Sequence, residues 1–270
     1  MFIPLHDQNA LKNVHLQFVT IILIALNFGF WLITATPQIT GVLEANSIYV
    51  SYGFIPAVVN DFAVLPPELA VLPEQANYVT YAFLHTGFMH LAGNMLFLWV
   101  FGDNIEDAMG HLKFVVFYVI CAIAGAVAHG ISLPQSHAPL IGASGATAGI
   151  VSAYLMLHPR VKVWILALGR IPLRLSAMWV LGAWILFQIF NFLLDGTNEV
   201  SWAAHIGGAL AGIALIPFFK RSDVALFDRN LLETGNVTSQ SGQEKSDQQP
   251  GKMADRVNPV ESPHKWGRGD

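Results

Sequence analysis

The sequence predicts an all-α, polytopic membrane protein: a bundle of six transmembrane helices followed by a disordered C-terminal tail. Only 12% of the 270 residues are charged, about half of the roughly 25% that is usual in soluble domains. A run from Phe114 to Pro159 contains no Asp, Glu, Lys or Arg. The last 49 residues, by contrast, are polar and carry eight acidic and six basic side chains, too little apolar surface to drive folding. We therefore divide the chain into a membrane domain, 1–221, and a cytoplasmic tail, 222–270.

Six stretches meet the requirement for a membrane span, which is about 20 mostly apolar residues. The first stretch is longer than the apolar core of a signal peptide (roughly 7–15 residues) and no clear cleavage site follows it, so we expect a mature helix. The uncharged run is too long for one crossing, and Pro134 and Pro139 divide it. An apolar run at 161–168 is too short to span and is expected to be interfacial or hairpin-like. The expected spans are 16–35, 88–102, 114–131, 144–157, 175–194 and 200–219.

The basic residues predict how these spans are oriented. Eight Lys and Arg residues precede residue 222, and the connections 36–87, 132–143 and 195–199 contain none of them. Cytoplasmic loops carry the excess of Lys and Arg in membrane proteins. We therefore expect both termini in the cytoplasm, these three connections outside, and a multi-pass protein of a plasma membrane, the inner membrane of a bacterium.

Composition also removes several classes of partner and cofactor. The formal net charge of −4 gives no indication of nucleic-acid binding. The single cysteine, Cys121, excludes an intramolecular disulfide and a cysteine-based zinc site, and we expect it to be a packing residue. No metal and no other cofactor is expected; the expected surroundings are the lipid bilayer and transmembrane protein substrates.

Four polar residues within the spans are expected to meet beneath the outer surface. Polar groups in a membrane are costly, and by default they mark functional sites. His90 and Asn94 are four residues apart near the outer end of the second span, so they share one helix face. Ser144 and His205 begin the fourth and sixth spans, which enter from the same side.

The spacing of glycines predicts that the fourth and sixth spans touch. Gly145 and Gly149 form one small-xxx-small pair and Gly208 and Gly212 form another, a pattern that lets helix backbones approach closely. His205 lies on the same face as the second pair. This approach would bring the Ser144 hydroxyl within hydrogen-bond reach of His205.

These residue types suit acyl-transfer chemistry. A serine hydroxyl is a poor nucleophile unless a base lies beside it, and His205 is the candidate base. The oxyanion that develops needs donors, for which His90, Asn94 and the backbone N–H of Ser144, at a helix start, are suitable.

Each feature alone also has a simpler explanation. The run Gly142-Ala143-Ser144-Gly145 is weak by itself because small residues fill membrane-helix interfaces. Ala146 stands where the nucleophile elbow of soluble hydrolases requires glycine. His85 fits a functional place and a place at the lipid headgroups equally well. The remaining histidines near span ends are expected to be interfacial: His129, His137 and His158.

Taken together, these motifs resemble the rhomboid family of intramembrane serine proteases. The residues that carry the resemblance are His90-Leu91-Ala92-Gly93-Asn94, Gly142-Ala143-Ser144-Gly145, and Ala204-His205-Ile206-Gly207-Gly208 with Gly212, within roughly residues 10–220. The resemblance implies a six-helix rhomboid-like bundle and a Ser–His dyad without an acidic third member. It implies that Ser144 is the nucleophile, His205 the general base, and His90 and Asn94 the oxyanion-stabilising pair, with Gly142 opening the serine motif. The segment 102–110, with Glu106, resembles a family turn that has a structural role.

Two positions depart from the family pattern. Many members carry an aromatic residue four positions after the nucleophile, packed on the histidine, where this chain has Ala148. The Trp-Arg pair that many members show in the first external loop is absent. These departures bear on the orientation of His205 and on the position of the first external loop in the membrane.

We therefore expect a serine endopeptidase that cleaves single-span membrane proteins through an acyl-enzyme. The resemblance implies that the fifth span is a lateral gate for the substrate. A catalytically silent rhomboid-like protein that binds membrane clients is the alternative. A histidine-lined transporter would require intramembrane carboxylates and often shows inverted repeats, neither of which is seen in the expected spans.

Overall fold

The computed structural model describes residues 2–36, 45–167, 169–194 and 201–228. Six long helices lie where the six spans are predicted: α1 (Phe18–Ala35), α6 (Phe88–Met109), α7 (His111–Ser132), α8 (Ser144–Leu157), α9 (Ala177–Leu194) and α10 (Trp202–Phe219). Shorter elements complete the described chain: β1 (Phe2–Asp7), α3 (Ala45–Tyr52), α4 (Pro56–Val59), η1 (Glu74–Ala76), α5 (Asn77–Thr80), η2 (Tyr81–Phe83), β2 (Lys162–Ala167), β3 (Ile171–Ser176) and η3 (Leu226–Asp228). The predicted fold class, a helical membrane protein, is confirmed.

Four of the six long helices are long and apolar enough to cross a membrane by themselves: α1, α7, α9 and α10. Helix α8 is apolar but has only 14 residues. Helix α6 continues seven residues past the predicted end at 102 and includes three carboxylates, Asp103, Glu106 and Asp107. The sequence-based boundary was too early there because it stopped at the first charged residue.

Helix α8 lies at the centre of the bundle. It packs against α6, α7, α9 and α10, and every residue from Gly145 to Tyr154 is buried. The glycine pairs bring α10 onto it as predicted: a Cβ atom at Gly208 would lie 1.9 Å from the Gly145 carbonyl oxygen. A Cβ at Gly212 would lie 2.2 Å from the Gly149 carbonyl oxygen. The two backbones are therefore in direct contact along two turns.

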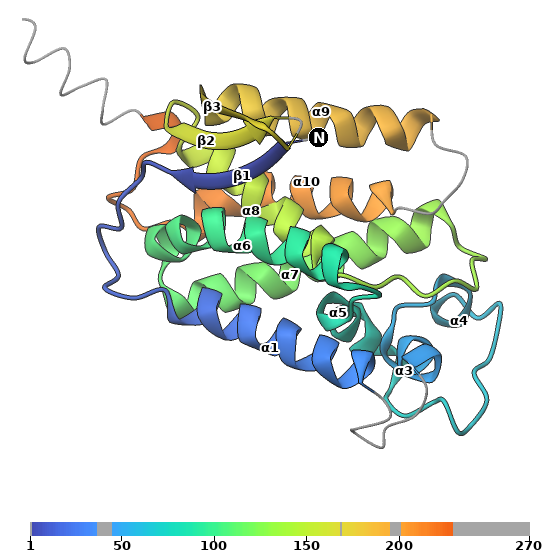
Figure 1. Ribbon diagram of the computed structural model, residues 1–270. Helices are drawn as coiled ribbons and strands as arrows, with labels where there is room; N and C mark the ends of the chain where they lie inside the picture. The colour runs from blue at the N-terminus through green and yellow to red at the C-terminus, as the bar shows by residue number, and fades with distance from the viewer. Residues whose placement is uncertain (1, 37–44, 168, 195–200, 229–270) are drawn as a thin grey trace, which may run out of the picture. The chain divides into compact units, whose positions relative to one another are not determined.

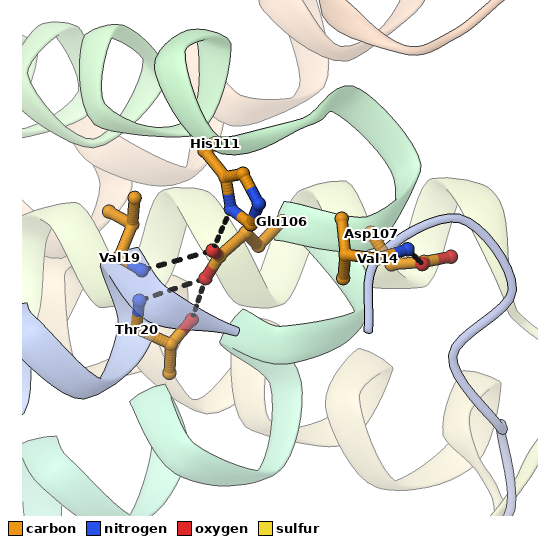
Figure 2. Close-up of polar contacts among 6 residues, drawn as sticks. All are labelled: Val14, Val19, Thr20, Glu106, Asp107 and His111. Atoms are coloured by element: carbon orange, nitrogen blue, oxygen red, sulfur yellow. Dashed lines mark hydrogen bonds and ion pairs between the residues drawn. The ribbon is translucent and has the colours of Figure 1, made fainter. Parts of the chain in front are cut away.

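Two carboxylates of α6 cap the N-terminal part of the chain (Figure 2). Glu106 accepts hydrogen bonds from the backbone N–H groups of Val19 (3.0 Å) and Thr20 (2.8 Å) and from the Thr20 hydroxyl (2.7 Å). His111 Nδ1 lies 2.5 Å from the same carboxylate. Asp107 accepts from three consecutive N–H groups at 12–14. The first turn of a helix has no internal partners for its N–H groups and favours negative charge, so the structural role expected for Glu106 has a physical basis.

A three-stranded antiparallel sheet, in the order β1-β2-β3, lies at one end of the helices, opposite the end that carries α3, α4 and α5 (Figure 1). Strands β2 and β3 form the hairpin expected around 161–168, with Gly169 at φ +68° in its turn. Strand β1 was not predicted. It pairs with β2 from Phe2↔Ala167 to Asp7↔Val163.

Buried Asp7 ties this sheet to the bundle. Its Oδ2 accepts hydrogen bonds from the Tyr154 hydroxyl (2.6 Å) and the Asn104 amide (2.9 Å). Burial raises the pKa of the Asp7 carboxyl above its usual value near 3.8, and the bond from Tyr154 partly opposes that shift. The N-terminal strand, the β2–β3 hairpin and the ends of α6 and α8 therefore form one connected end of the molecule.

The described chain extends beyond the predicted domain end at 221. Asp228 is buried, accepts a hydrogen bond from the Arg160 N–H (3.0 Å) and lies 3.2 Å from His158 Nδ1. The remainder of the predicted tail, 229–270, lies outside the described residues, as does the whole of the connection predicted at 195–199.

Candidate active site

Ser144 is the first residue of α8 and stands at the end of a tightly held loop. Gly142 has φ +117°, a backbone conformation that side chains rarely adopt, and its N–H donates to the Tyr81 carbonyl at 2.9 Å. Ala143 and Gly145 are buried on either side, whereas Ser144 is half-buried. The hydroxyl therefore sits at the one partly open position of this segment.

His90 and Asn94 lie against the loop that leads into Ser144. A Cβ atom at Gly142 would be 2.7 Å from His90 Nε2 and 3.9 Å from Asn94 Nδ2. Only glycine at position 142 leaves room for the His90 ring beside this loop. Asn94 is buried and its amide also donates to the His90 carbonyl at 3.1 Å. Two of the predicted donor groups are thus gathered beside the serine motif.

His85 belongs to the same cluster of polar side chains. The side chain is fully buried. Its Nε2 accepts from the Ala143 N–H at 3.5 Å and lies 3.2 Å from Asn94 Nδ2. The His85 and His90 rings meet edge to face, with centroids 5.0 Å apart. One sequence signal could have assigned His85 to the site: it lies just before the second predicted span, close to His90 and Asn94 at the start of that span.

His129 is also buried. Its Nδ1 lies 2.6 Å from the Ser201 hydroxyl, which itself accepts from the Ala204 N–H at the start of α10. This histidine therefore helps to hold the helix that carries His205.

His205 is half-buried on α10 and is held by two residues of α9. Its Nδ1 lies 3.1 Å from Gln188 Oε1. The Trp184 ring stacks on the imidazole at 26° with centroids 6.5 Å apart, and Trp202 meets it edge-on at 5.8 Å. The stacking surface that Ala148 cannot provide is thus supplied by another helix.

The two helices meet as predicted, but among the described residues no hydrogen bond joins Ser144 to His205. Catalytic hydrogen bonds are often long in enzymes without bound substrate. The geometry provides a half-buried hydroxyl, an imidazole with Nδ1 already bonded, and donors beside the serine loop. In the ranges that the structure describes, no group of three His, Cys, Asp or Glu side chains could hold a metal ion.

Comparison with known proteins matches most of this region to one family. The family model described as "Rhomboid domain" matches residues 73–222, which include all the site residues named above. RHOMBOID-like protein 5 of Arabidopsis thaliana is 30% identical over 142 residues, covering 53% of this chain and 43% of that protein. Rhomboid protein 1, mitochondrial, of Saccharomyces cerevisiae is 31% identical over 142 residues, covering 49% and 38%. Rhomboid-like protease 3 of Toxoplasma gondii is 32% identical over 143 residues, covering 53% and 51%.

The chain spans between about two fifths and half of the length of these relatives. Together with the four helices that are long and apolar enough to cross a membrane, the family match identifies an integral membrane protein.

Proposed function

Because this chain belongs to the rhomboid family, we propose that it is an intramembrane serine endopeptidase that cleaves single-span membrane proteins. Two observations support the proposal. Gly208, three residues after His205, meets the backbone of Gly145, which follows Ser144. His90 and Asn94 lie against Gly142, two residues before the same serine. A nucleophile, a base and oxyanion donors are the three parts that acyl transfer needs.

In the proposed mechanism, Ser144 Oγ attacks the carbonyl carbon of the scissile peptide bond while its proton passes to His205 Nε2. The negative charge moves to the carbonyl oxygen, where the Ser144 N–H, the Asn94 amide and the His90 ring donate hydrogen bonds. When the tetrahedral intermediate collapses, His205 returns the proton to the leaving amine and an acyl-enzyme remains. Water then attacks the ester with the same histidine as base, which frees the acid product and restores Ser144.

The membrane sets two requirements for the substrate. A hydrogen-bonded helix hides its carbonyl groups in lipid, so the cleaved segment must unwind locally, which small residues and helix breakers favour. Hydrolysis also needs water, which would reach the outer end of α8 from outside. A substrate helix would come from the bilayer instead, past α9, whose buried residues are few (Ala177, Val180, Leu181 and Gln188).

We also propose that both termini lie in the cytoplasm. The pairing of β1 with β2 supports a common side for the N-terminus and the connection between α8 and α9, and the Lys and Arg residues of these segments favour the cytoplasmic side. A bacterial plasma membrane is the setting in which we propose this orientation.

The test is cleavage of single-span reporters by the protein in liposomes, with Ser144→Ala and His205→Ala as variants. We expect cleavage by the wild type and a loss of at least 1,000-fold in each variant, as for other serine nucleophiles and bases. Equal cleavage by all three proteins would disprove the dyad. Tight binding of reporters without cleavage by the wild type would favour the silent, client-binding alternative.

A further inference from the structure

The buried face of α9 presents two side chains to His205. Trp184 and Gln188 are four residues apart and so share one face of this helix. Gln188 is 6% exposed, whereas large apolar residues elsewhere on α9 are exposed, among them Trp179 (68%), Phe190 (60%) and Leu193 (72%). An amide removed from water is costly unless it is hydrogen-bonded, and the His205 ring is its partner.

This bond selects one form of the imidazole. Gln188 Oε1 can only accept a hydrogen bond, so the facing Nδ1 of His205 must carry the proton. In a neutral imidazole the other nitrogen is then an acceptor. Nε2 is therefore left unprotonated, the form that can take a proton from a serine hydroxyl, while Trp184 on one ring face restricts rotation.

We propose that Gln188 is a positioning residue that fixes the tautomer and orientation of His205, with Trp184 as the supporting surface; this rests on the function proposed above. In soluble serine hydrolases a buried carboxylate bonded to Nδ1 has this role. An amide provides the same acceptor without placing a second charge in the membrane, where charge is costly.

The placement of both residues on α9 has a mechanistic consequence. The base is held in its active form only while α9 rests against α10. A displacement of α9 that admits a substrate helix would separate Gln188 from His205. The tautomer and orientation of His205 are then restored only when α9 returns. Substrate admission and activation of the dyad are thereby ordered in time.

The test uses the full chain in liposomes and three variants. Gln188→Leu removes the acceptor at similar size, and Gln188→Glu keeps an oxygen acceptor at the same place. Asn191→Leu is the matched control, because it also removes an amide from α9, one that within the described ranges donates only to the Phe187 carbonyl of its own helix. Each variant is measured for reporter cleavage and for the tautomer of His205 by ¹⁵N NMR of the ring nitrogens.

For Gln188→Leu we expect kcat to fall about 5- to 20-fold, because the variant loses the hydrogen bond that orients His205. KM should change less than twofold. Gln188→Glu should restore most of kcat, and Asn191→Leu should match the wild type. The wild-type ring should be protonated at Nδ1, and Gln188→Leu should show a mixture of tautomers. Two results would overturn the inference. The first is an unchanged kcat in Gln188→Leu. The second is a loss of kcat in Gln188→Leu that Gln188→Glu does not restore, while the tautomer of His205 is the same as in the wild type.

These outcomes are separable from failure of the proposed function. If the wild type cleaves no reporter, the protease proposal fails, while the tautomer measurement still decides whether Gln188 sets the protonation of His205. If the wild type cleaves and Gln188→Leu cleaves equally well, only the positioning role fails.

Discussion

A single methyl group at Gly208 should force α8 and α10 apart. The Cβ atom of Gly208→Ala would lie 1.9 Å from the Gly145 carbonyl oxygen and 2.7 Å from its carbon, whereas ordinary contacts begin at 3.4 Å. The obstacle is backbone, so no side chain can rotate away. The helices must separate by about 1.5 Å, and overpacking of this kind costs typically 1–3 kcal/mol, here at the upper end, about 3 kcal/mol.

The expected signal follows from the size of the protein. For a domain of 150–250 residues, 1 kcal/mol shifts Tm by roughly 2–4 °C, so Gly208→Ala should lower Tm by about 6–12 °C. The same separation moves Ser144 from His205, and a displacement of about 1 Å can reduce a rate 100-fold. The rate at which a fluorophosphonate labels Ser144 should therefore fall by roughly that factor.

The chain contains its own reporter for this experiment. Cys121 is the single cysteine and is fully buried, so a thiol-reactive fluorogenic dye reports unfolding in detergent. Gly29→Ala on α1 is the matched control, since a Cβ there meets nothing within 4 Å and alanine favours helix. Its Tm should stay at or slightly above that of the wild type. If the two variants unfold at the same temperature, the backbone contact does not hold α8 and α10 together and the reasoning is wrong.

Three further predictions concern other parts of the described structure. Glu106→Gln should lower the free energy of unfolding by about 2–4 kcal/mol because an amide cannot accept every hydrogen bond that the carboxylate accepts. Thr20→Val loses one hydroxyl hydrogen bond and should lower it by about 1 kcal/mol. Both variants are measured with the Cys121 dye, and equal effects would contradict the capping role. Gly142→Ala, with its Cβ 2.7 Å from His90 Nε2 at positive φ, should slow fluorophosphonate labelling at least tenfold, and a wild-type rate would show that the loop is not constrained. Because burial raises the pKa of Asp7, the folded protein holds that proton more tightly than the unfolded chain, so stability is lost as pH rises from about 4 through the folded pKa. Asp7→Asn should make Tm fall less steeply with pH over this range. Parallel curves of Tm against pH for the variant and the wild type would refute the assignment.

The helices could be predicted from the sequence because the membrane imposes one dominant requirement. Long uncharged runs, the break at two prolines and the glycine spacing located all six long helices and the contact between α8 and α10. The end of α6 was missed because its carboxylates interrupt the apolar run, although in the fold Glu106 and Asp107 accept hydrogen bonds from N–H groups far away in sequence.

Features that depend on distant partners had no local signal. Strand β1 pairs with residues more than 150 positions away, and nothing in its own six residues indicates the partner. His85 is ambiguous until its contacts with Asn94 and the Ala143 N–H are known. Gln188 lies in a stretch that reads as lipid-facing, and only the approach of α10 gives it a partner.

The caps on α1 have a consequence for how the protein is made. Thr20 and its partner Glu106 are 86 residues apart, and chains grow at about 5–20 residues per second, so about 4 to 17 s separate the synthesis of the two groups. During that interval the first turn of α1 must have its N–H groups satisfied by water at the membrane surface, and it becomes fixed only after α6 has been inserted. Helix α1, which is synthesised before the other five long helices, is therefore among the last of them to be completed at its N-terminal end, and a ribosome that stalls before residue 106 leaves it uncapped.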